Sequence, residues 1–424
     1  MTEPGIEGFE MRNIMASELQ ASLDFQQRIF QIHDMPRLYP NYFENLNRRD
    51  PYFKYENVFV ALKGGKIVSH VQVFPKLIKV GEANVWMGGI GGVVTDPEYR
   101  RMGLASRLMW KSLEYMKDEG LETSLLFGDS SYYRRFGYYV ASPTSGFRIK
   151  SEKEVQTPYG YGWREFEIGD LDEVMEIYNR MNMNRTLSVI RSRETWLRQL
   201  ENPISPANED TKSFTVIENS SGVVAYARFS KRCPEGPEGE EGYVIECGAR
   251  RGEGVLQSLY AAIVNYSRAK GLGQIYVSLP ADDQFASFLL DAGAITVYSR
   301  EPDDTGTQLC IISLRETFVR LEEEFTRRIS SNPKHIGRTE MTISTDKGNV
   351  SLEVIDDKVR VFDDLRRGSI FKTDGDVLAQ MITGFMSPTE AVLQGKAVCS
   401  EETLKALEIL FPKGEPHIWY SDNF

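Results

Sequence analysis

The apolar positions of the first 150 residues alternate between strand-like and helix-like spacing. Runs rich in β-branched and aromatic residues span 57–62, 66–74 and 76–80, with turn residues at 63–65, and they predict an antiparallel meander. An apolar run at 85–95 then leads into Asp96-Pro97, after which leucines and methionines recur at helical spacing as far as Gly120. Residues 121–127 predict the next strand, and 132–136 a short helical turn.

Later segments predict two further units. The polar stretch 151–162 breaks both periodicities, and the second unit then runs to about residue 312, ending in a strand at 308–312. A helix at 314–329 opens the third unit, in which strand-like alternation at 340–364 precedes helical patterns at 374–383, 387–393 and 401–410. We therefore predict an α/β (α+β) protein with units at 1–150, 151–312 and 313–424, the last of them α+β.

Composition narrows the function classes. The chain has 424 residues, 41% of them hydrophobic, and a net charge of −11, which argues against a nucleic-acid partner and favours cationic amine substrates. The four cysteines and four histidines are scattered, so we expect neither a metal site nor a disulfide framework, and reduced cytoplasmic thiols. No signal sequence and no apolar run of about 18 residues is found, so we expect a cytoplasmic protein without a membrane partner.

The sharpest local motif lies where the apolar run at 85–95 gives way to the helix. Residues 100–105 fit the pattern Arg/Gln-x-x-Gly-x-Gly/Ala, with Arg100, Gly103 and Ala105 at the specified positions. A glycine, a small residue and free backbone N–H groups at a helix start form a seat for a pyrophosphate. Taken alone, the motif is equally compatible with an ordinary strand-to-helix turn that carries surface arginines.

A second motif follows about thirty residues later, where Tyr133 and Gly137 fit the pattern Tyr-x-x-x-Gly-Phe/Tyr. With both motifs in this order, the first unit resembles the GNAT acyltransferases. The resemblance implies that Tyr133 is the general acid and that acetyl-CoA is the co-substrate, without a metal. The expected coenzyme contacts are a splayed strand for the pantetheine arm and a phosphate seat: Val93, Val94, Thr95; Arg100, Arg101, Met102, Gly103, Leu104, Ala105.

The acid role is chemically reasonable, because a tyrosine pKa of about 10 lies only ~1.5 above that of a thiol, or ~2 kcal/mol uphill. The alternative is that Tyr133 only packs around a strand, which is the favoured interpretation for Tyr132, Tyr138 and Tyr139.

The second unit carries a degenerate copy of these motifs. Arg251 and Gly254 match Arg100 and Gly103, but Leu256 replaces the small residue and Leu289 replaces the tyrosine. A bulky leucine crowds a phosphate, and a leucine cannot donate a proton. We therefore predict a second GNAT-like fold that is catalytically silent.

Two GNAT-like units followed by an α+β unit resembling sterol carrier protein are similar to the layout of the enhanced-intracellular-survival (Eis) family. The resemblance implies acetylation of aminoglycosides or of lysine side chains, a homo-hexamer of two trimers, and the C-terminal carboxylate, here that of Phe424, as general base. An aromatic terminus is better explained if it is buried. The alternative is that it completes the core of the third unit.

Other possibilities stay open at this point. The chain could acetylate proteins, or it could bind a lipid or small molecule on a vestigial acyltransferase fold. The apolar residues of the third unit could line a lipid tunnel, although helical spacing favours a core. Candidates for the wall of an acceptor cleft lie in the early segment: Tyr39, Tyr42, Phe43, Phe53.

Overall fold

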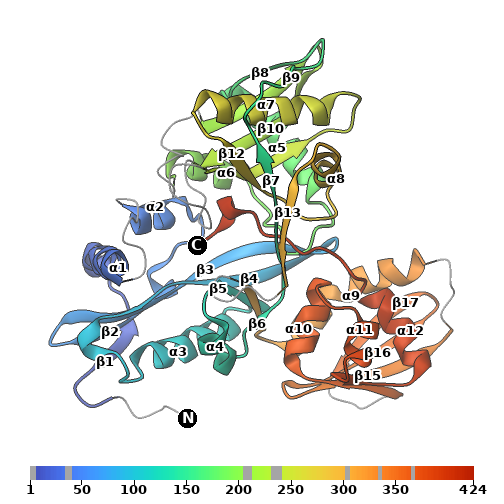
Figure 1. Ribbon diagram of the computed structural model, residues 1–424. Coiled ribbons are helices and arrows are strands. Elements are labelled where there is room, and N and C mark those ends of the chain that lie inside the picture. The colour runs from blue at the N-terminus through green and yellow to red at the C-terminus, as the bar shows by residue number, and fades with distance from the viewer. Residues whose placement is uncertain are drawn as a thin grey trace.

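The computed structural model describes residues 6–33, 41–203, 213–230, 241–300, 306–332, 337–363 and 368–424. These residues form three mixed domains, each built on its own sheet (Figure 1). The α/β (α+β) fold class expected from the sequence is confirmed. None of the described helices combines the length and the apolar composition needed to cross a bilayer.

The sheet of the first domain has the strand order β1-β2-β3-β4-β5-β14-β6. Its strands are β1 (Glu10–Asn13), β2 (Val58–Lys63), β3 (Lys66–Val80), β4 (Ala83–Thr95), β5 (Thr123–Phe127), β6 (Tyr139–Val140) and β14 (Thr307–Ile311). Strands β2, β3 and β4 form the expected antiparallel meander. Helices α1 (Leu19–His33) and α2 (Tyr42–Arg49) lie on one side of the sheet, and α3 (Leu104–Asp118) on the other (Figure 1). The predicted apolar stripe of α3 is buried through Leu104, Leu108 and Met116.

The sheet of the second domain has the order β13-β7-β12-β11-β10-β9-β8. Its strands are β7 (Thr144–Lys150), β8 (Gly162–Glu165), β9 (Phe214–Asn219), β10 (Gly222–Ser230), β11 (Glu241–Ala249), β12 (Gln274–Ser278) and β13 (Ile295–Ser299). Its helices are α5 (Leu171–Met181), α6 (Arg193–Glu201), α7 (Val255–Ala269) and α8 (Gln284–Asp291). As in the first domain, an antiparallel meander leads into a helix, α7, and then into a strand parallel to the end of the meander, β12.

The third domain joins a five-stranded sheet, ordered β17-β16-β15-β18-β19, to four helices. The strands are β15 (Thr339–Thr345), β16 (Gly348–Ile355), β17 (Lys358–Asp363), β18 (Ser369–Thr373) and β19 (Ala397–Val398). The helices are α9 (Leu314–Ser330), α10 (Gly375–Thr383), α11 (Pro388–Leu393) and α12 (Glu401–Leu410). Of the nine apolar residues considered for a lipid tunnel, Leu393 is 80% exposed. The other eight are buried: Phe371, Leu378, Met381, Ile382, Phe385, Met386, Leu407, Leu410.

Two strands cross the boundaries expected from the sequence. Strand β7, which ends at residue 150, pairs with β12 and β13 in the second sheet rather than in the first. Strand β14, placed in the second unit by its position in the chain, pairs with β5 and β6 in the first sheet. The alternation of apolar residues specifies a strand but not the sheet that it joins, so the second domain is inserted within the first.

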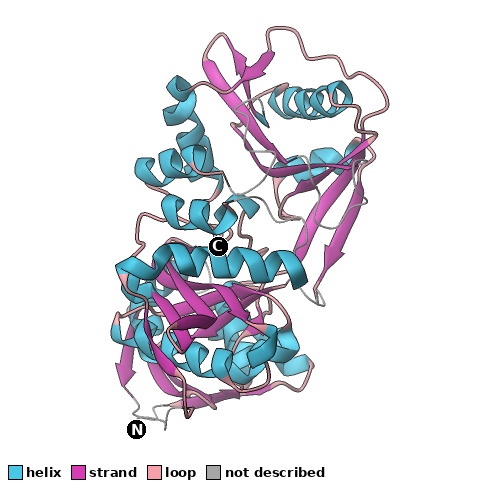
Figure 2. Cartoon of the chain, turned by 90° about the vertical axis from the view of Figure 1, so that its left-hand side faces the viewer, coloured by secondary structure: helices cyan, strands magenta, loops and turns pink. Residues whose placement is uncertain are grey.

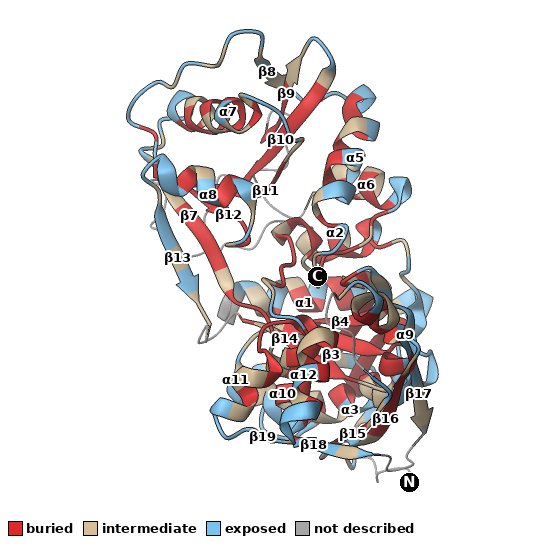
Figure 3. Cartoon of the chain, turned by 90° about the vertical axis from the view of Figure 1, so that its right-hand side faces the viewer, coloured by how far each residue is buried: buried red, intermediate tan, exposed pale blue. Residues whose placement is uncertain are grey.

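The first and third domains share one core. Phe318, Leu321 and Phe325 of α9 are buried together with Val85 and Met87 of β4, and α9 contacts β17 on its other side. Figure 3 shows α9 beside β3 and β4, with buried residues along both strands. The second domain stands above this pair, and the C-terminus lies between the two halves of the molecule (Figure 2).

Candidate active site

Strands β4 and β5 separate in the middle of the first sheet. They pair in parallel from Met87–Thr123 to Gly89–Leu125, after which β4 continues to Thr95 without pairing to β5. Residues 90–95 of β4 therefore present a backbone edge to the opening. The side chains of two of the expected coenzyme contacts point elsewhere, because Val94 packs against α1 and Thr95 bonds Ser69. Only their backbone is available to a pantetheine arm.

A bulge in β4 shapes this edge. The register with β3 shifts between His70 and Gln72, and Gly92 opposite has φ +59°. A Cβ on Gly92 would lie 2.4 Å from Gln26 Oε1 and 2.9 Å from His70 Cε1, so only glycine fits. Burial lowers the pKa of His70 to about 4. The neutral ring can thus donate from Nδ1 to the Gly92 carbonyl at 2.7 Å, which fixes the bulge.

The expected phosphate seat is an open helix start. Gly103 is the N-cap of α3 with φ +80°, and it has no side chain to bond the first amides of the helix. Arg101 also has a positive φ, +63°, and a Cβ at Gly103 would meet no atom within 4 Å. Arg100, Arg101 and Met102 are exposed and Ala105 is half-buried, whereas Leu104 is buried and can contribute only its backbone. Free amides beside two arginines fit a pyrophosphate.

The matching position in the second domain is covered. Gly254 caps α7 with φ +74°, but a Cβ there would lie 3.1 Å from the ring of Tyr161. The Tyr161 hydroxyl donates to the Glu253 carbonyl at 2.5 Å, which holds the ring over the helix start. Leu289, in the place of the tyrosine, is fully buried. These contacts support the expectation that the second domain is catalytically silent. They also show that the Tyr161 ring blocks its helix start, which the comparison of motifs did not predict.

A cavity of about 480 Å³ lies where the first domain, the second domain and the C-terminal tail meet. The first domain lines it with residues 90–93 of β4, with Phe127 and Tyr133, and with the helix residues Phe30, Tyr42, Phe43 and Leu46. The second domain contributes residues 142–145, Tyr243, Tyr276 and Ser278, and the tail contributes His417, Ile418, Tyr420, Asn423 and Phe424. Tyr42 and Phe43 were expected in the cleft wall. Phe53 instead packs near Ile14 and Val58, and Tyr39 lies outside the described residues.

Tyr133 ends the short helix α4 (Ser130–Tyr133), which Asp129 caps by accepting from the Ser131 amide. The Tyr133 ring packs closely on Gly128, just after the end of β5: a Cβ at Gly128 would lie 2.8 Å from this ring. The Tyr132 ring meets it edge-on at 4.9 Å. Tyr133 is therefore held at the cavity wall by packing. By contrast, Tyr138 is buried with its hydroxyl 2.6 Å from Ser124, as expected of a core residue.

Phe424 crosses into the first domain. A Cβ at Gly89 would lie 2.6 Å from its ring, and a Cβ at Gly91 would lie 3.0 Å from its carboxyl carbon, so two glycines of β4 make room for it. Its ring centroid lies 6.0 Å from that of Phe74 and 5.3 Å from that of Phe127. The Phe424 carboxyl group and Tyr133 consequently line one cavity at the separation of β4 and β5.

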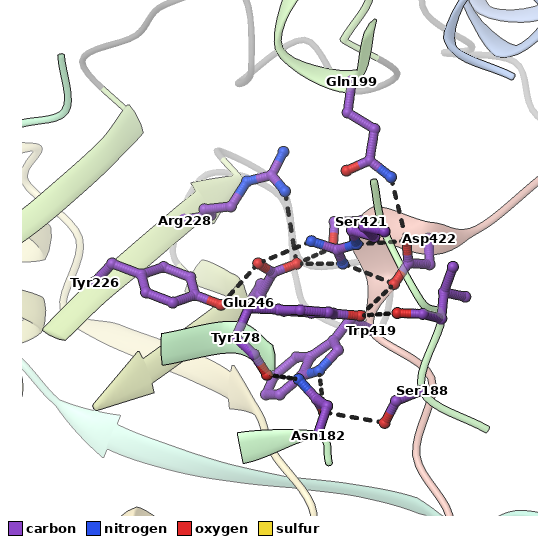
Figure 4. Close-up of polar contacts among 12 residues, drawn as sticks. Tyr178, Asn182, Ser188, Gln199, Tyr226, Arg228, Glu246, Trp419, Ser421 and Asp422 are labelled. Atoms are coloured by element: carbon purple, nitrogen blue, oxygen red, sulfur yellow. Dashed lines mark hydrogen bonds and ion pairs between the residues drawn. The ribbon is translucent and has the colours of Figure 1, made fainter. Parts of the chain in front are cut away.

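A buried ion-pair network holds the tail just before Phe424 (Figure 4). Arg191 contacts Asp422 and Glu246, each at 2.7 Å, and all three side chains are 0% exposed. Burial alone would raise the pKa of Glu246, but Arg191 and Arg228 hold it at about 2. Asp422 also accepts from Gln199 at 3.2 Å, and Arg49 donates to the Ser421 carbonyl. The second domain thus anchors the tail.

No local sequence pattern indicated this network, because its members are single charged residues far apart in the chain. Arg191 and Asp422 are separated by 231 positions. The one available signal was a charged residue, Asp422, inside an aromatic tail. Trp419 packs into the core of the second domain, not into that of the third.

Comparison with known proteins identifies the first domain. Residues 10–141 match the family model described as an acetyltransferase (GNAT) domain. The uncharacterized N-acetyltransferase YhbS of Escherichia coli K12 is 30% identical over 78 residues, which are 18% of this chain. The matched region spans about half, 46%, of that relative's length.

Solved structures match almost the whole chain in fold. A GCN5-related N-acetyltransferase from Anabaena variabilis superposes with a TM-score of 0.72 at 17% identity, covering 98% of this chain and 100% of that one. Eis1 from Mycobacterium abscessus superposes with a TM-score of 0.65 at 16% identity and the same coverage. Residues 10–141 of the chain therefore match a GNAT acetyltransferase domain, and the chain as a whole shares its fold with GCN5-related N-acetyltransferases.

Proposed function

We propose that the protein is an acetyl-CoA-dependent N-acetyltransferase that acetylates a small-molecule amine by direct transfer. The observation that carries this proposal is that Tyr133, the unpaired edge of β4 and the Phe424 carboxyl group line one cavity. Residues 93–95 would pair through their backbone with the pantetheine arm, and residues 100–105 would seat the pyrophosphate. Bound there, acetyl-CoA supplies an activated acetyl thioester.

The residues of the cavity can move both protons of the reaction. The amine nitrogen attacks the thioester carbon, the carbon–sulfur bond breaks, and the Tyr133 hydroxyl protonates the departing thiolate. The ammonium form of the acceptor must first lose a proton, which the Phe424 carboxylate takes directly or through a water. An α-carboxyl group in water has a pKa of about 3.3–3.7, so the transfer of an ammonium proton to it is uphill near pH 7 and must be coupled to the attack of the amine.

A covalent route through cysteine has less support. Burial raises the pKa of Cys310 to about 12 and that of Cys247 well above its usual range, so neither is a ready nucleophile. Cys399 lies next to β19 in the third domain, and Cys233 lies outside the described residues. Direct transfer from coenzyme to amine needs no such intermediate.

The acceptor class expected from the sequence is a polycation such as an aminoglycoside, on the grounds of net charge and resemblance to the Eis family. Lysine side chains of proteins are the second candidate from the same resemblance. The hexameric assembly and the sterol-carrier character of the third domain also stay predictions from that resemblance. The cytoplasmic location stays a prediction from the scattered cysteines and the absence of a signal sequence or spanning segment.

The test is a screen of amine acceptors with acetyl-CoA, with thiol release as the signal and mass spectrometry of the product. We expect at least one amine to gain an acetyl group at a rate that falls by a factor of 10² or more in Tyr133→Phe. Thiol release that no amine stimulates, at equal rates in both proteins, would contradict the proposal.

A further inference from the structure

The walls of the cavity carry no formally charged side chain among the described residues. Its lining includes aromatic, aliphatic and hydroxyl side chains, but no aspartate, glutamate, lysine or arginine. His417 is also neutral near pH 7, because burial lowers its pKa to about 3. The one charge that the described wall offers is the main-chain carboxylate of Phe424.

Charges just behind the wall do not favour a polycation either. Three arginines surround two carboxylates next to Tyr420 and Asn423, so this group has a net charge of +1 (three minus two): Arg49, Arg191, Arg228, Glu246, Asp422. The Lys76 ammonium lies 5.8 Å from the centroid of the Phe424 ring, and the buried Asp50 carboxylate is the main opposite charge acting on it, so counting both leaves the sum at +1 (four minus three). A second or third ammonium on the acceptor would therefore lose its water without gaining a carboxylate partner.

Some of the polar groups in the cavity wall already form hydrogen bonds within the protein. Ser142 Oγ donates to the Pro416 carbonyl and Ser145 Oγ to the Leu279 carbonyl, both at 2.7 Å. Aromatic rings dominate the remaining surface, and they provide apolar contact as well as faces that attract a single cation. The volume of about 480 Å³ is in the range of small-molecule pockets.

We propose that the acceptor is a primary monoamine with an apolar, aromatic body, rather than a polycation. This inference rests on the proposed N-acetyltransferase function and specifies its substrate class. The single ammonium meets the Phe424 carboxylate and loses its proton there, and the aromatic body lies among the rings of Phe43, Tyr243 and Tyr276. Acetyl then passes from the coenzyme sulfur to the amine nitrogen, giving an amide and free coenzyme thiol.

The experiment compares kcat/KM of the full chain for 2-phenylethylamine, spermidine and kanamycin, at one pH and one ionic strength, with acetyl-CoA saturating. We expect 2-phenylethylamine to exceed both polycations by at least tenfold. A smaller advantage, or a preference for either polycation, would overturn the substrate class and leave the N-acetyltransferase function standing. Turnover of none of the three amines, with acetyl-CoA binding verified by calorimetry, would overturn the substrate class as well, and the wider amine screen would then decide the N-acetyltransferase function.

A pair of variants tests the cause of the selectivity. Thr144 lines the cavity at the start of β7 and is half-buried. Thr144→Asp places a carboxylate in the wall, and Thr144→Asn is the neutral control of the same shape. We expect the ratio of kcat/KM for spermidine over 2-phenylethylamine to rise at least tenfold in the Asp variant relative to the Asn variant. An unchanged ratio in a folded protein would overturn the argument, and if the Asp variant does not fold, the comparison of acceptors decides.

Discussion

Replacing Arg191 with methionine should destabilise the protein and displace the end of the chain. Methionine is long enough to fill much of the space, but it removes the cation that pairs with both Glu246 and Asp422. The side chains of Glu246 and Asp422 are then left with 0% exposure and without Arg191. Among the described residues, the cation that stays within ion-pair range is Arg228, 3.5 Å from Glu246. Because Asp422 lies two residues before Phe424, we expect the same change to lower kcat while leaving acetyl-CoA affinity within twofold.

Two routes give a similar magnitude. Breaking a buried pair by removing one partner typically destabilises a protein by about 3–5 kcal/mol. Independently, a Glu246 pKa held at about 2 instead of the usual 4.5 corresponds to ~3 kcal/mol of stabilisation of the charged form. We therefore expect Arg191→Met to lose at least ~3 kcal/mol of unfolding free energy at pH 7.

The pH dependence has a definite sign. A carboxylate with a depressed pKa contributes stability that is fully present above pH ~4.5 and is lost as the pH falls toward 2. In the variant, Glu246 loses its main partner and its pKa rises, so protonation of Glu246 relieves part of the destabilisation. The difference in stability between parent and variant should thus be largest near neutral pH and shrink between pH ~6 and ~4.

Urea unfolding followed by tryptophan fluorescence is a suitable assay, because Trp196 and Trp419 are almost fully buried. The Arg191 guanidinium lies 4.5 Å from the centroid of the Trp196 ring. Trp419 lies beside the same network (Figure 4). Arg268→Met is the matched control, since Arg268 pairs with Glu154 at 3.3 Å with both side chains largely exposed, and it should lose less than about 1 kcal/mol. A loss below 1 kcal/mol in Arg191→Met, or an equal loss at pH 4 and pH 7, would refute this reasoning.

Three further predictions concern the remaining parts of the site. Ala105→Leu should weaken acetyl-CoA binding at least tenfold by crowding the start of α3, and calorimetry showing unchanged affinity would remove residues 100–105 from the coenzyme site. Tyr133→Phe should lower kcat by about 10² to 10⁴ with little change in coenzyme affinity, whereas Tyr132→Phe should have a mild effect; a kcat within twofold of the parent would exclude the acid role. Appending a few residues after Phe424, with the mass of the intact chain checked first, should cut kcat severely without changing the fold or coenzyme binding, and parental turnover would require another base.

Local sequence patterns predicted the elements around the proposed coenzyme site and placed them correctly. These elements are the meander of β2, β3 and β4, the apolar stripe of α3 and the turn before Tyr133. Each depends on the spacing of apolar and turn residues within a short segment, and this spacing can be read from the sequence. Likewise, the degenerate motif at Gly254 was visible because two short patterns could be compared. The covering of Gly254 by the Tyr161 ring could not be predicted in this way, because Tyr161 lies more than ninety positions earlier in the chain.

The acceptor side of the site depends on long-range packing that no local pattern records. Arg191, Tyr243 and Tyr276 reach the site from three separate segments of the second domain, and each is an ordinary residue in its own neighbourhood. The net charge of −11 pointed to a polycationic acceptor, yet net charge does not tell where the acidic residues lie. An aromatic terminus suggested burial but could not identify the domain that receives it.

The insertion of the second domain between β6 and β14 has a consequence for how the chain folds during synthesis. Strand β5 gains its neighbour β14 only when residues 307–311 have left the ribosome, about 180 residues after β5 itself. Until then the central strand of a catalytic sheet has an open edge, which is a template for aggregation. A fragment ending at residue 150 would keep that edge permanently, together with a β7 that lacks its partner strands, so we expect such a fragment to aggregate unless it also includes β14.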